Sequence, residues 1–350
     1  MKRILLVLCG VVAVVLVVVG LVRWTADDDI PEDLPNVVLI VMCSTRADQT
    51  PMYGGAFDTM PSLEARASGA LVFEDGVTAA PWTRPAVAAI VTGSHPATWG
   101  MLEPLARRSD RVLPREARTM AERLDAVGYE TIGRSANPNV SAAFGLDQGF
   151  DDFANLSPRW RHGVHKVLGS EVVEALVAAV DTRSDPEAPL FVQAMFVDPH
   201  QPTTASRVAG RAYRGPDEPL RLGRYRAMLR SLDAAVDRLL TQLSERGITE
   251  DNTVFVVVND HGDAVWDAAV VDRLGGADDV VGPICQDLAS LLERFDGYRG
   301  RFSAALARVR AGDGEWFARP MIDSYHTVWF ELHENLLATL GIERAKEHAA

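Results

Sequence analysis

Four short polar clusters contain the residue types that could do chemistry. Each follows an apolar run or opens a predicted helix, and they lie at residues 43–48, 81–85, 198–202 and 259–263. They hold a thiol, hydroxyls, carboxylates and imidazoles, which are the groups that attack esters and bind divalent cations. In a parallel α/β sheet, ligands bind beyond the carboxyl ends of the strands. The clusters therefore predict one site that is assembled from segments far apart in the sequence.

Thr83 is the candidate nucleophile. It stands at the start of a predicted helix, where free backbone N–H groups and the helix dipole favour an anion and an ionised hydroxyl. Asp260 and His261 follow a predicted strand and offer an oxygen and a nitrogen ligand to a cation. Purely structural alternatives stay open at this stage, because threonine is a common helix N-cap and aspartate often caps the turn after a strand.

The elements that must position these residues alternate between strands and helices. Residues 36–42 (NVVLIVM) form a continuous apolar run, as expected of a strand buried on both faces. Further strands are predicted at residues 71–77, 129–133, 190–197 and 253–258, with helices at 61–69, 84–92, 119–127 and 225–246. The alternation predicts an α/β fold, a three-layer α/β/α sandwich with a mainly parallel central sheet.

Composition limits the classes of function. The chain has 350 residues, 47% apolar and 24% charged, which is ordinary for a globular protein. Its net charge is −13, and the first 24 residues hold three basic residues and no acid, so the remainder is more acidic still. A domain with this much negative charge is repelled by the phosphates of nucleic acid, so no nucleic-acid partner is expected.

The amino-terminal segment predicts a membrane anchor. Residues 4–22 carry no charge and follow Lys2 and Arg3. As a helix they would span about 28 Å, close to the roughly 30 Å hydrocarbon core. The short basic end favours a single anchor with the main domain outside the cytoplasm, periplasmic or extracellular. Cleavage as a secretory signal stays open, and the protein would then be secreted.

The cysteines and the domain boundaries give two further expectations. Of the three cysteines, Cys9 lies inside the apolar run, so at most one disulfide is expected, between Cys43 and Cys285. The predicted organisation is an anchor or signal over residues 1–24, a linker over 25–35 and one domain over 36–350, in which 264–325 form an acidic, helix-prone insertion.

The order of the motifs resembles the sulfatase family of the alkaline-phosphatase superfamily. Residues 35–48 read PNVVLIVMCSTRAD, Thr83-Arg84-Pro85 matches the family's C/S/T-x-P nucleophile motif, and Thr92-Gly93 follow nine and ten residues after Thr83. The segments GYETIG, ANPNVS and FGLDQGFDDF come next, and then Asp198-Pro199-His200 and Asp260-His261-Gly262. The resemblance covers residues 35–263 and points to a threonine-bearing branch.

This resemblance implies a fold and an activity. The fold is the α/β/α sandwich of the family with a shortened carboxy-terminal subdomain. The activity is hydrolysis of sulfate or phosphate esters outside the cytoplasm through Thr83 and one divalent metal, calcium or magnesium in the family. The implied ligands are Asp260, His261, Cys43 and Ser44, and the implied substrate is a small anionic ester or a sulfated glycan. Relatives with cysteine as nucleophile convert it to formylglycine, which a threonine cannot form.

Several positions depart from the family pattern. Cys43 stands where the family has its first metal-binding aspartate, which removes a hard oxygen ligand. A Cys43 thiolate favours zinc, whereas the alternative is that Cys43 is only a small buried residue at a strand end. Ala86 and Val87 replace a serine and an arginine, and Met195 replaces a histidine of many relatives. These losses favour a second hypothesis, a catalytically inactive pseudosulfatase that binds an anionic ligand.

Three residues are expected to contact the substrate. They are His200, Arg84 and His326, of which His326 follows from similarity to a family stretch His/Arg-Thr-Leu-Tyr-Asp-Glu-Leu. Neither Lys166 nor Lys346 falls at the place of the family's lysine. A third hypothesis is a membrane-associated transferase of the phosphoglycerol or phosphoethanolamine type, which also uses a threonine.

Overall fold

The computed structural model describes residues 34–101, 112–157, 166–262, 268–311, 313, 316 and 322–340. The chain divides into two compact units. The first unit holds the strands and nearly all of the helices around them. The second unit consists mainly of the chain from Ala264 onward, with the last described helices, and among the described residues it also includes the short segment Pro216–Leu222. The predicted anchor over residues 4–22 lies outside the described residues. None of the helices that are described is long and apolar enough to cross a membrane.

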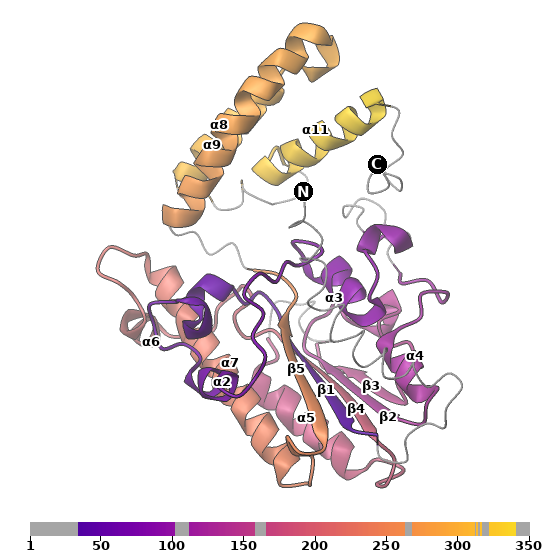
Figure 1. The fold of residues 1–350 in the computed structure, drawn as a ribbon. Helices are drawn as coiled ribbons and strands as arrows, with labels where there is room; N and C mark the ends of the chain where they lie inside the picture. The colour runs from indigo at the N-terminus through magenta and orange to yellow at the C-terminus, as the bar shows by residue number, and fades with distance from the viewer. Residues whose placement is uncertain are drawn as a thin grey trace. The chain divides into compact units, whose positions relative to one another are not determined.

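The first unit is built on a parallel sheet, as the alternation of elements predicts (Figure 1). Its strands lie in the order β3-β2-β4-β1-β5, and every neighbouring pair is parallel. The strands are β1 (Asn36–Met42), β2 (Glu130–Ser135), β3 (Asp152–Asn155), β4 (Leu190–Phe196) and β5 (Thr253–Asn259). The α/β class and the mainly parallel central sheet are therefore confirmed.

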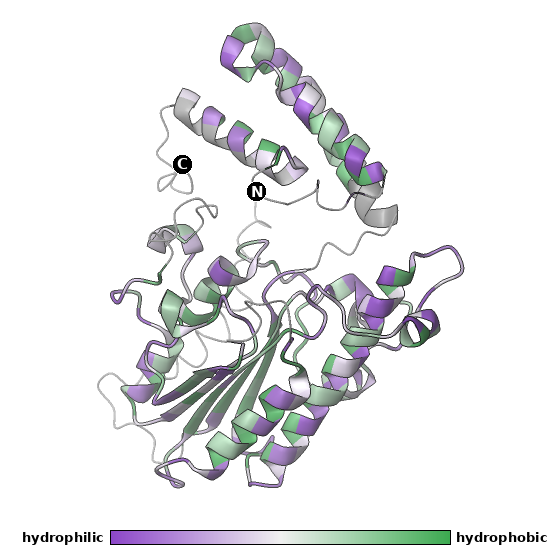
Figure 2. Ribbon diagram, turned by 180° about the vertical axis from the view of Figure 1, so that it is seen from behind, coloured by the Kyte–Doolittle hydropathy of each residue, from purple (hydrophilic) through white to green (hydrophobic). Residues whose placement is uncertain are grey.

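The centre of the sheet is formed by β1 and β4. All seven residues of β4 are buried and so are six of the seven in β1, which explains why both strands, green in Figure 2, are apolar except for Asn36 and Gln193. In the register between β1 and β5, Met42 pairs with Asn259. The next residues along both strands, Cys43 and Asp260, therefore leave the same edge of the sheet side by side.

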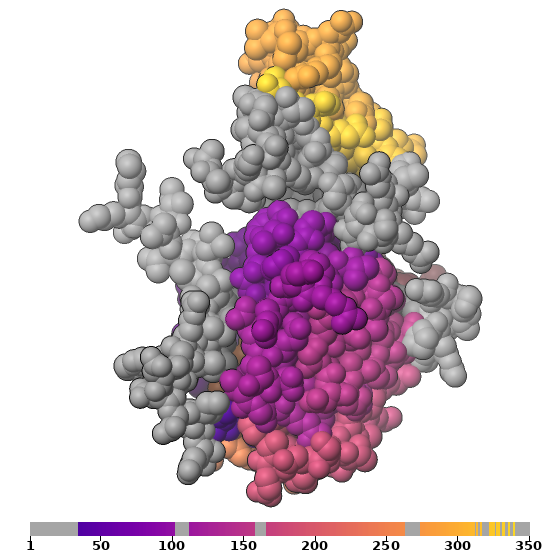
Figure 3. Space-filling model, turned by 90° about the vertical axis from the view of Figure 1, so that its right-hand side faces the viewer, coloured from indigo at the N-terminus to yellow at the C-terminus, as the bar shows by residue number. Residues whose placement is uncertain are grey.

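Helices cover both faces of this sheet. Figures 1 and 2 show α5 (Gly169–Asp181) and α7 (Leu220–Ser244) along one face, with α3 (Thr83–Thr92) and α4 (Met120–Asp125) on the other. On the side seen in Figure 3 the surface of the first unit runs from purple to magenta, so segments before β4 make up most of it. The remaining short helices of this unit are α2 (Pro61–Ala67), α6 (Arg207–Ala212), η2 (Ala47–Gln49), η3 (Pro51–Tyr53), η4 (Pro96–Trp99) and η6 (Ala142–Phe144).

The second unit is helical and has its own core. It contains α8 (Ala268–Leu291), η8 (Glu293–Phe295), α9 (Tyr298–Arg310) and α11 (Tyr325–Leu340). Phe295, Phe302 and Val328 are almost completely buried in a cluster that joins these helices. The helix-prone character of residues 264–325 therefore appears as α8 and α9, which lie against each other (Figure 1).

Three expectations about the elements need correction. The strand predicted at residues 71–77 does not form, because the segment pairs with no strand and leaves Leu71 and Val77 each 77% exposed. The short strand β3 was not predicted, since four residues carry too little pattern to indicate a strand. The one disulfide that the sequence allowed, between Cys43 and Cys285, does not form, because both residues are free, buried thiols.

Candidate functional site

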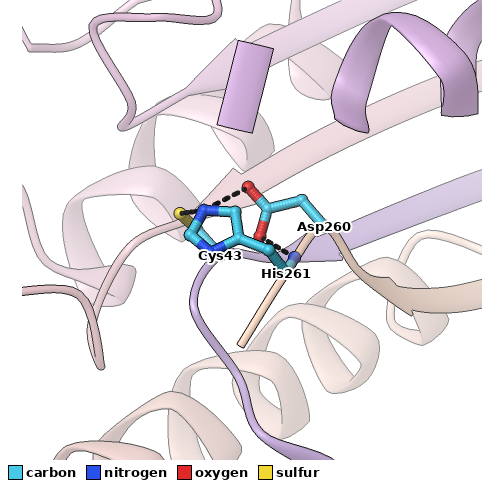
Figure 4. Close-up of side chains that lie close together, drawn as sticks. All are labelled: Cys43, Asp260 and His261. Carbon is cyan, nitrogen blue, oxygen red and sulfur yellow. Dashed lines mark hydrogen bonds and ion pairs between the residues drawn. The ribbon is translucent and has the colours of Figure 1, made fainter. Parts of the chain in front are cut away.

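The candidate site lies at the carboxyl edge of the sheet. Cys43 and Ser44 follow β1, Asp260 and His261 follow β5, and Thr83 is the first residue of α3. Figure 4 shows the side chains of Cys43, Asp260 and His261 pointing toward one another from the ends of these two strands. The structure therefore brings together five residues from three segments of the sequence.

The turn after β1 is held in an uncommon conformation. Ser44 has a φ of 60°, in the left-handed region that residues other than glycine seldom occupy. The buried hydroxyl of Tyr225 fixes this turn, since it donates to the Ser44 carbonyl at 2.7 Å and accepts from the Arg46 N–H at 2.9 Å. As a result, the Ser44 N–H points across to β5 and donates to Asp260 Oδ1 at 3.1 Å.

Asp260 is a completely buried carboxylate with one unsatisfied oxygen. Its Oδ1 accepts two backbone N–H groups, from Ser44 at 3.1 Å and from His261 at 2.7 Å. Its Oδ2 accepts no hydrogen bond from the residues that the structure describes, and it lies 3.5 Å from His261 Nε2, a distance at which the contact is electrostatic at most. A buried carboxylate oxygen without a donor is costly, so this atom is suited to a cation.

The tautomer of His261 follows from its contacts. Nδ1 lies 2.7 Å from the Gly262 carbonyl oxygen, which can only accept, so Nδ1 carries the proton. In the neutral ring, Nε2 then has a free lone pair and lies 3.1 Å from Thr83 Oγ1 and 3.9 Å from Cys43 Sγ. That single lone pair can accept the Thr83 hydroxyl proton or bind a cation, but it cannot do both at once.

Cys43 lies at the centre of the cluster and is fully buried. Burial, and next to it the charge of Asp260, raises the pKa of the Cys43 thiol well above its ordinary value. Its Sγ is 3.6 Å from Thr83 Oγ1. Without a cation the side chain therefore stays a neutral thiol, and a cation beside it would favour the thiolate.

The donor atoms at this site fit a zinc ion. One donor atom each from Cys43, Asp260 and His261 lies within 4.8 Å of the others, and all three residues are buried. Bond lengths of about 2.3 Å to sulfur and about 2.0 Å to nitrogen at a tetrahedral angle place these two donors about 3.5 Å apart. The observed separation of 3.9 Å needs only a small adjustment, and a sulfur, nitrogen and oxygen set suits zinc better than calcium.

Thr83 does not cap its own helix. The N-cap of α3 is Trp82, and the Thr83 side chain instead reaches His261 Nε2 at 3.1 Å, so the capping explanation is wrong. A residue that the sequence analysis did not single out completes the surroundings of the hydroxyl. Asn137 Nδ2 lies 3.3 Å from Thr83 Oγ1 and 3.3 Å from Cys43 Sγ. Its only signal in the sequence is its place in the ANPNVS segment after a predicted strand.

The residues expected to contact the substrate lie in different surroundings. The Arg84 guanidinium stacks 3.4 Å from the Phe144 ring centre and donates to Asn139 Oδ1 at 2.9 Å. His200 follows β4, and its Nδ1 lies 2.6 Å from the Gln201 carbonyl oxygen. His326 belongs to α11 in the second unit, and its side chain is outside the described structure.

Lys166 holds the loop that carries His200. Its buried ammonium donates to the carbonyl oxygens of Asp198 at 2.7 Å, Pro202 at 3.3 Å and His200. The Asp198 carboxyl beneath this loop is buried, which raises its pKa, and its Oδ1 accepts the Gly169 N–H at 3.1 Å. These contacts give Lys166 the surroundings of a residue that stabilises a loop.

The positions that depart from the family pattern pack in the core. Ala86, Val87 and Met195 are each at most 1% exposed. Their side chains cannot donate hydrogen bonds, so these three positions supply no donors to an anion. The polar groups gathered at the carboxyl edge are instead those of Thr83 and Asn137 with the three candidate ligands.

Comparison with known proteins agrees with this geometry. A sequence model of the sulfatase family matches residues 35–280. The chain is 24% identical over 265 residues to an ulvan-active sulfatase of Formosa agariphila, covering 65% of this chain and 50% of that protein. It is 23% identical over 313 residues to an arylsulfatase of Clostridium perfringens, covering 67% of this chain and 64% of that protein. The chain thus spans half to nearly two thirds of the length of these relatives.

Solved structures share the fold. The putative sulfatase yidJ from Bacteroides fragilis superposes with a TM-score of 0.55 at 18% identity, covering 67% of this chain and 63% of that one. The C-terminal periplasmic domain of EcEptC from Escherichia coli, in complex with zinc, superposes with a TM-score of 0.53 at 16% identity, covering 67% of this chain and 66% of that one. Because the family match extends over more than half of the sequence, the chain belongs to the sulfatase family.

Proposed function

We propose that this sulfatase-family protein hydrolyses sulfate esters with Thr83 as the nucleophile. The observation that supports this most directly is the position of Thr83 Oγ1, 3.1 Å from His261 Nε2 and 3.6 Å from Cys43 Sγ, at the start of α3. A hydroxyl gathered with a thiol, an imidazole and a carboxylate at a helix amino terminus is suited to attack an anionic ester.

The residues of the chain have separable tasks in this reaction. Thr83 Oγ1 bonds to the sulfur of the ester while the bond from sulfur to the leaving alcohol breaks, and the proton that Thr83 loses is balanced by the proton that the departing alcohol oxygen gains. Water then splits the threonine sulfate into sulfate and the regenerated threonine hydroxyl. The amino terminus of α3, where Thr83 stands, carries the positive end of the helix dipole, which favours the negative charge of the sulfuryl group. In the metal-free protein, His261 Nε2 accepts the Thr83 hydroxyl proton.

Cys43, Asp260 and His261 would hold one divalent cation, for which we propose zinc. The unsatisfied Asp260 Oδ2 and the sulfur of Cys43 support this, as does the zinc complex of the EcEptC domain with the same fold. When bound, the cation supplies Lewis-acid stabilisation of charge that develops on oxygen. Calcium or magnesium, the metals that the family resemblance implies, would lack their preferred all-oxygen ligands here.

A sulfated glycan is the substrate class that we propose. The ulvan-active sulfatase supports it by its name, and the arylsulfatase of Clostridium perfringens supports small aryl esters as test substrates. We also propose that residues 4–22 anchor the chain in a membrane and that the catalytic domain lies outside the cytoplasm. The uncharged run behind Lys2 and Arg3 supports that location, and protease treatment of intact cells would test it.

The nucleophile is tested with the full chain loaded with zinc, calcium or magnesium. Aryl sulfates, aryl phosphates and sulfated oligosaccharides are the substrates. Thr83→Ala should lower kcat by at least about 10³-fold, whereas Thr83→Ser, which keeps the hydroxyl, should retain measurable activity. Thr92→Ala is the matched control in the same helix, because the Thr92 hydroxyl donates to the Ala88 carbonyl at 2.7 Å and accepts the Ser94 N–H at 3.3 Å, both at the far end of α3. Its kcat should stay within about twofold of wild type.

Two results would redirect the assignment. Activity that survives in Thr83→Ala would exclude Thr83 as the nucleophile. A folded, metal-loaded protein that is inactive on every ester but binds sulfate or phosphate would support the pseudosulfatase hypothesis, which the loss of donors at Ala86 and Val87 favours.

A further inference from the structure

Asn137 is the polar residue that the proposed chemistry leaves unexplained. It follows β2, is 0% exposed, and places its side-chain nitrogen 3.3 Å from both Thr83 Oγ1 and Cys43 Sγ. One amide thus bridges the candidate nucleophile and a candidate metal ligand. These two side chains come from α3 and from the end of β1.

The orientation of this amide is fixed by a third contact. Asn137 Oδ1 accepts the backbone N–H of Asn139 at 2.9 Å, and an N–H can bond only to the oxygen end of the amide. The NH₂ end must therefore face Thr83 and Cys43, and it can only donate to them.

The backbone of Asn137 is held independently of the site. Ser135 Oγ accepts its N–H at 3.1 Å, and Asn155 Nδ2 donates to its carbonyl at 2.8 Å and to the Val140 carbonyl at 2.7 Å. Asn155 ends β3, so the two neighbouring strands fix the loop between them. The amide therefore has a defined place even before Thr83 and Cys43 meet it.

A donor in this position controls where protons can go. A hydroxyl oxygen has one proton and two lone pairs, so an N–H that donates to Thr83 Oγ1 turns the Thr83 proton away from Asn137 and toward His261 Nε2. The same amide favours charge on both atoms that it contacts, the oxygen of Thr83 and the sulfur of Cys43. When His261 Nε2 serves as a ligand instead, Asn137 still holds the Thr83 oxygen.

We propose that Asn137 is the positioning residue of this site, which aims the Thr83 hydroxyl for attack and supports Cys43 as a metal ligand. The Thr83 half of this inference rests on the proposed function. The Cys43 half does not, because it concerns metal affinity alone. Residues that orient metal ligands and nucleophiles from behind typically contribute 10- to 100-fold to affinity or activity.

The test is Asn137→Asp in the full chain. This variant keeps the size and the acceptor for the Asn139 N–H, but replaces the donor that faces Thr83 and Cys43 by a carboxylate oxygen. We expect kcat of Asn137→Asp to fall about 100-fold with KM within about threefold. Zinc affinity should fall about 10-fold in Asn137→Ser, which removes the amide donor without adding a charge beside the cation.

Asn36→Asp is the matched control at the opposite edge of the sheet. Asn36 Oδ1 also accepts a backbone N–H, from Leu190 at 2.9 Å, and its Nδ2 also lies near a threonine hydroxyl, Thr253 Oγ1, at 3.5 Å. This control should keep the kcat and the zinc affinity of wild type within about twofold, even if its stability falls. Asn137→Ser, a smaller and uncharged change, provides the same comparison if Asn137→Asp does not fold.

The outcomes separate this inference from the proposed function. If Asn137→Asp or Asn137→Ser matches Asn36→Asp in both kcat and zinc affinity, the inference is refuted. If the wild-type protein hydrolyses no ester, the proposed function fails and the Thr83 half fails with it, while zinc titration by calorimetry still decides the Cys43 half. An unchanged zinc affinity in Asn137→Ser, or a kcat loss in Asn137→Asp no larger than that of Asn36→Asp, would show that Asn137 has only a structural role.

Discussion

Replacing Cys43 by aspartate should exchange the metal preference of the site. In the wild-type protein the donors are a sulfur, an imidazole nitrogen and a carboxylate oxygen within 4.8 Å of one another. We expect zinc to bind at least about 100-fold more tightly than calcium, a difference of about 2.7 kcal/mol. Cys43→Asp restores a hard oxygen ligand, so zinc should lose this advantage and calcium or magnesium should gain affinity.

The same substitution carries a cost that only a cation can offset. Position 43 is 0% exposed and lies beside Asp260, so a second carboxylate there is buried against a like charge. We expect the metal-free variant to lose about 3 kcal/mol of unfolding free energy. A cation present at 100 times its Kd raises the unfolding free energy of the variant by about 2.7 kcal/mol. For a unit of this size that gain raises Tm by about 5–10 °C.

Two measurements decide the matter. Metal affinities come from competition with chelators of known strength, and thermal unfolding is followed with zinc, calcium, magnesium or no metal. Cys285→Ala is the control, since it removes the other described thiol, which is buried in the second unit, and should leave zinc affinity unchanged. Equal zinc affinity in wild type and Cys43→Ala would refute the reasoning, and so would a wild-type protein that prefers calcium.

Two further predictions concern the supports of the fold. Tyr225→Phe removes the hydroxyl that forms hydrogen bonds with the Ser44 carbonyl and the Arg46 N–H. Because both of these buried bonds are lost, the free energy of unfolding measured with urea should fall by about 2 kcal/mol. Tyr129→Phe removes one hydrogen bond, to the Pro35 carbonyl at the amino edge of the sheet, and should lower the free energy of unfolding by about half as much. An equal loss in the two variants would contradict the role of Tyr225 in holding the turn after β1. Burial, with the charge of Asp278, raises the pKa of Tyr325, so the folded state resists its ionisation and the second unit should lose stability as the pH rises above about 10. Tyr325→Phe should flatten that decline in thermal scans between pH 8 and 11, and an unchanged slope would assign the decline to other groups.

The elements that the sequence predicts well are those that carry their own pattern. The mainly apolar segments at residues 36–42 and 190–197 become β1 and β4 because a strand buried on both faces needs apolar side chains at nearly every position. The helix predicted at residues 61–69 becomes α2, and that at 119–127 becomes α4 behind its Thr119 cap. Residues 71–77 have a strand-like composition, but composition cannot supply a neighbouring strand, and the segment stays irregular.

The candidate site could be predicted only in part. Thr83, Cys43, Asp260 and His261 come together as expected, because parallel strands bring their carboxyl ends to one edge. The role of Asn137 could not be predicted, because its amide contacts Cys43, which lies 94 positions earlier in the sequence, and no local pattern indicates that contact. The sequence places Tyr225 at the start of a predicted helix. Only the three-dimensional structure shows that its hydroxyl forms a hydrogen bond with the turn after β1.

The distance along the chain between β1 and β5 has a consequence for biosynthesis. Cys43 and His261 are 218 positions apart, and the strands that carry them become neighbours only when β5 is added beside β1. A nascent or prematurely terminated chain that ends before β5 would contain the threonine and the thiol, yet neither the imidazole nor the carboxylate. Such contacts between remote segments form slowly. Assembly of the candidate metal site therefore belongs to a late stage of folding, after most of this unit has been translated.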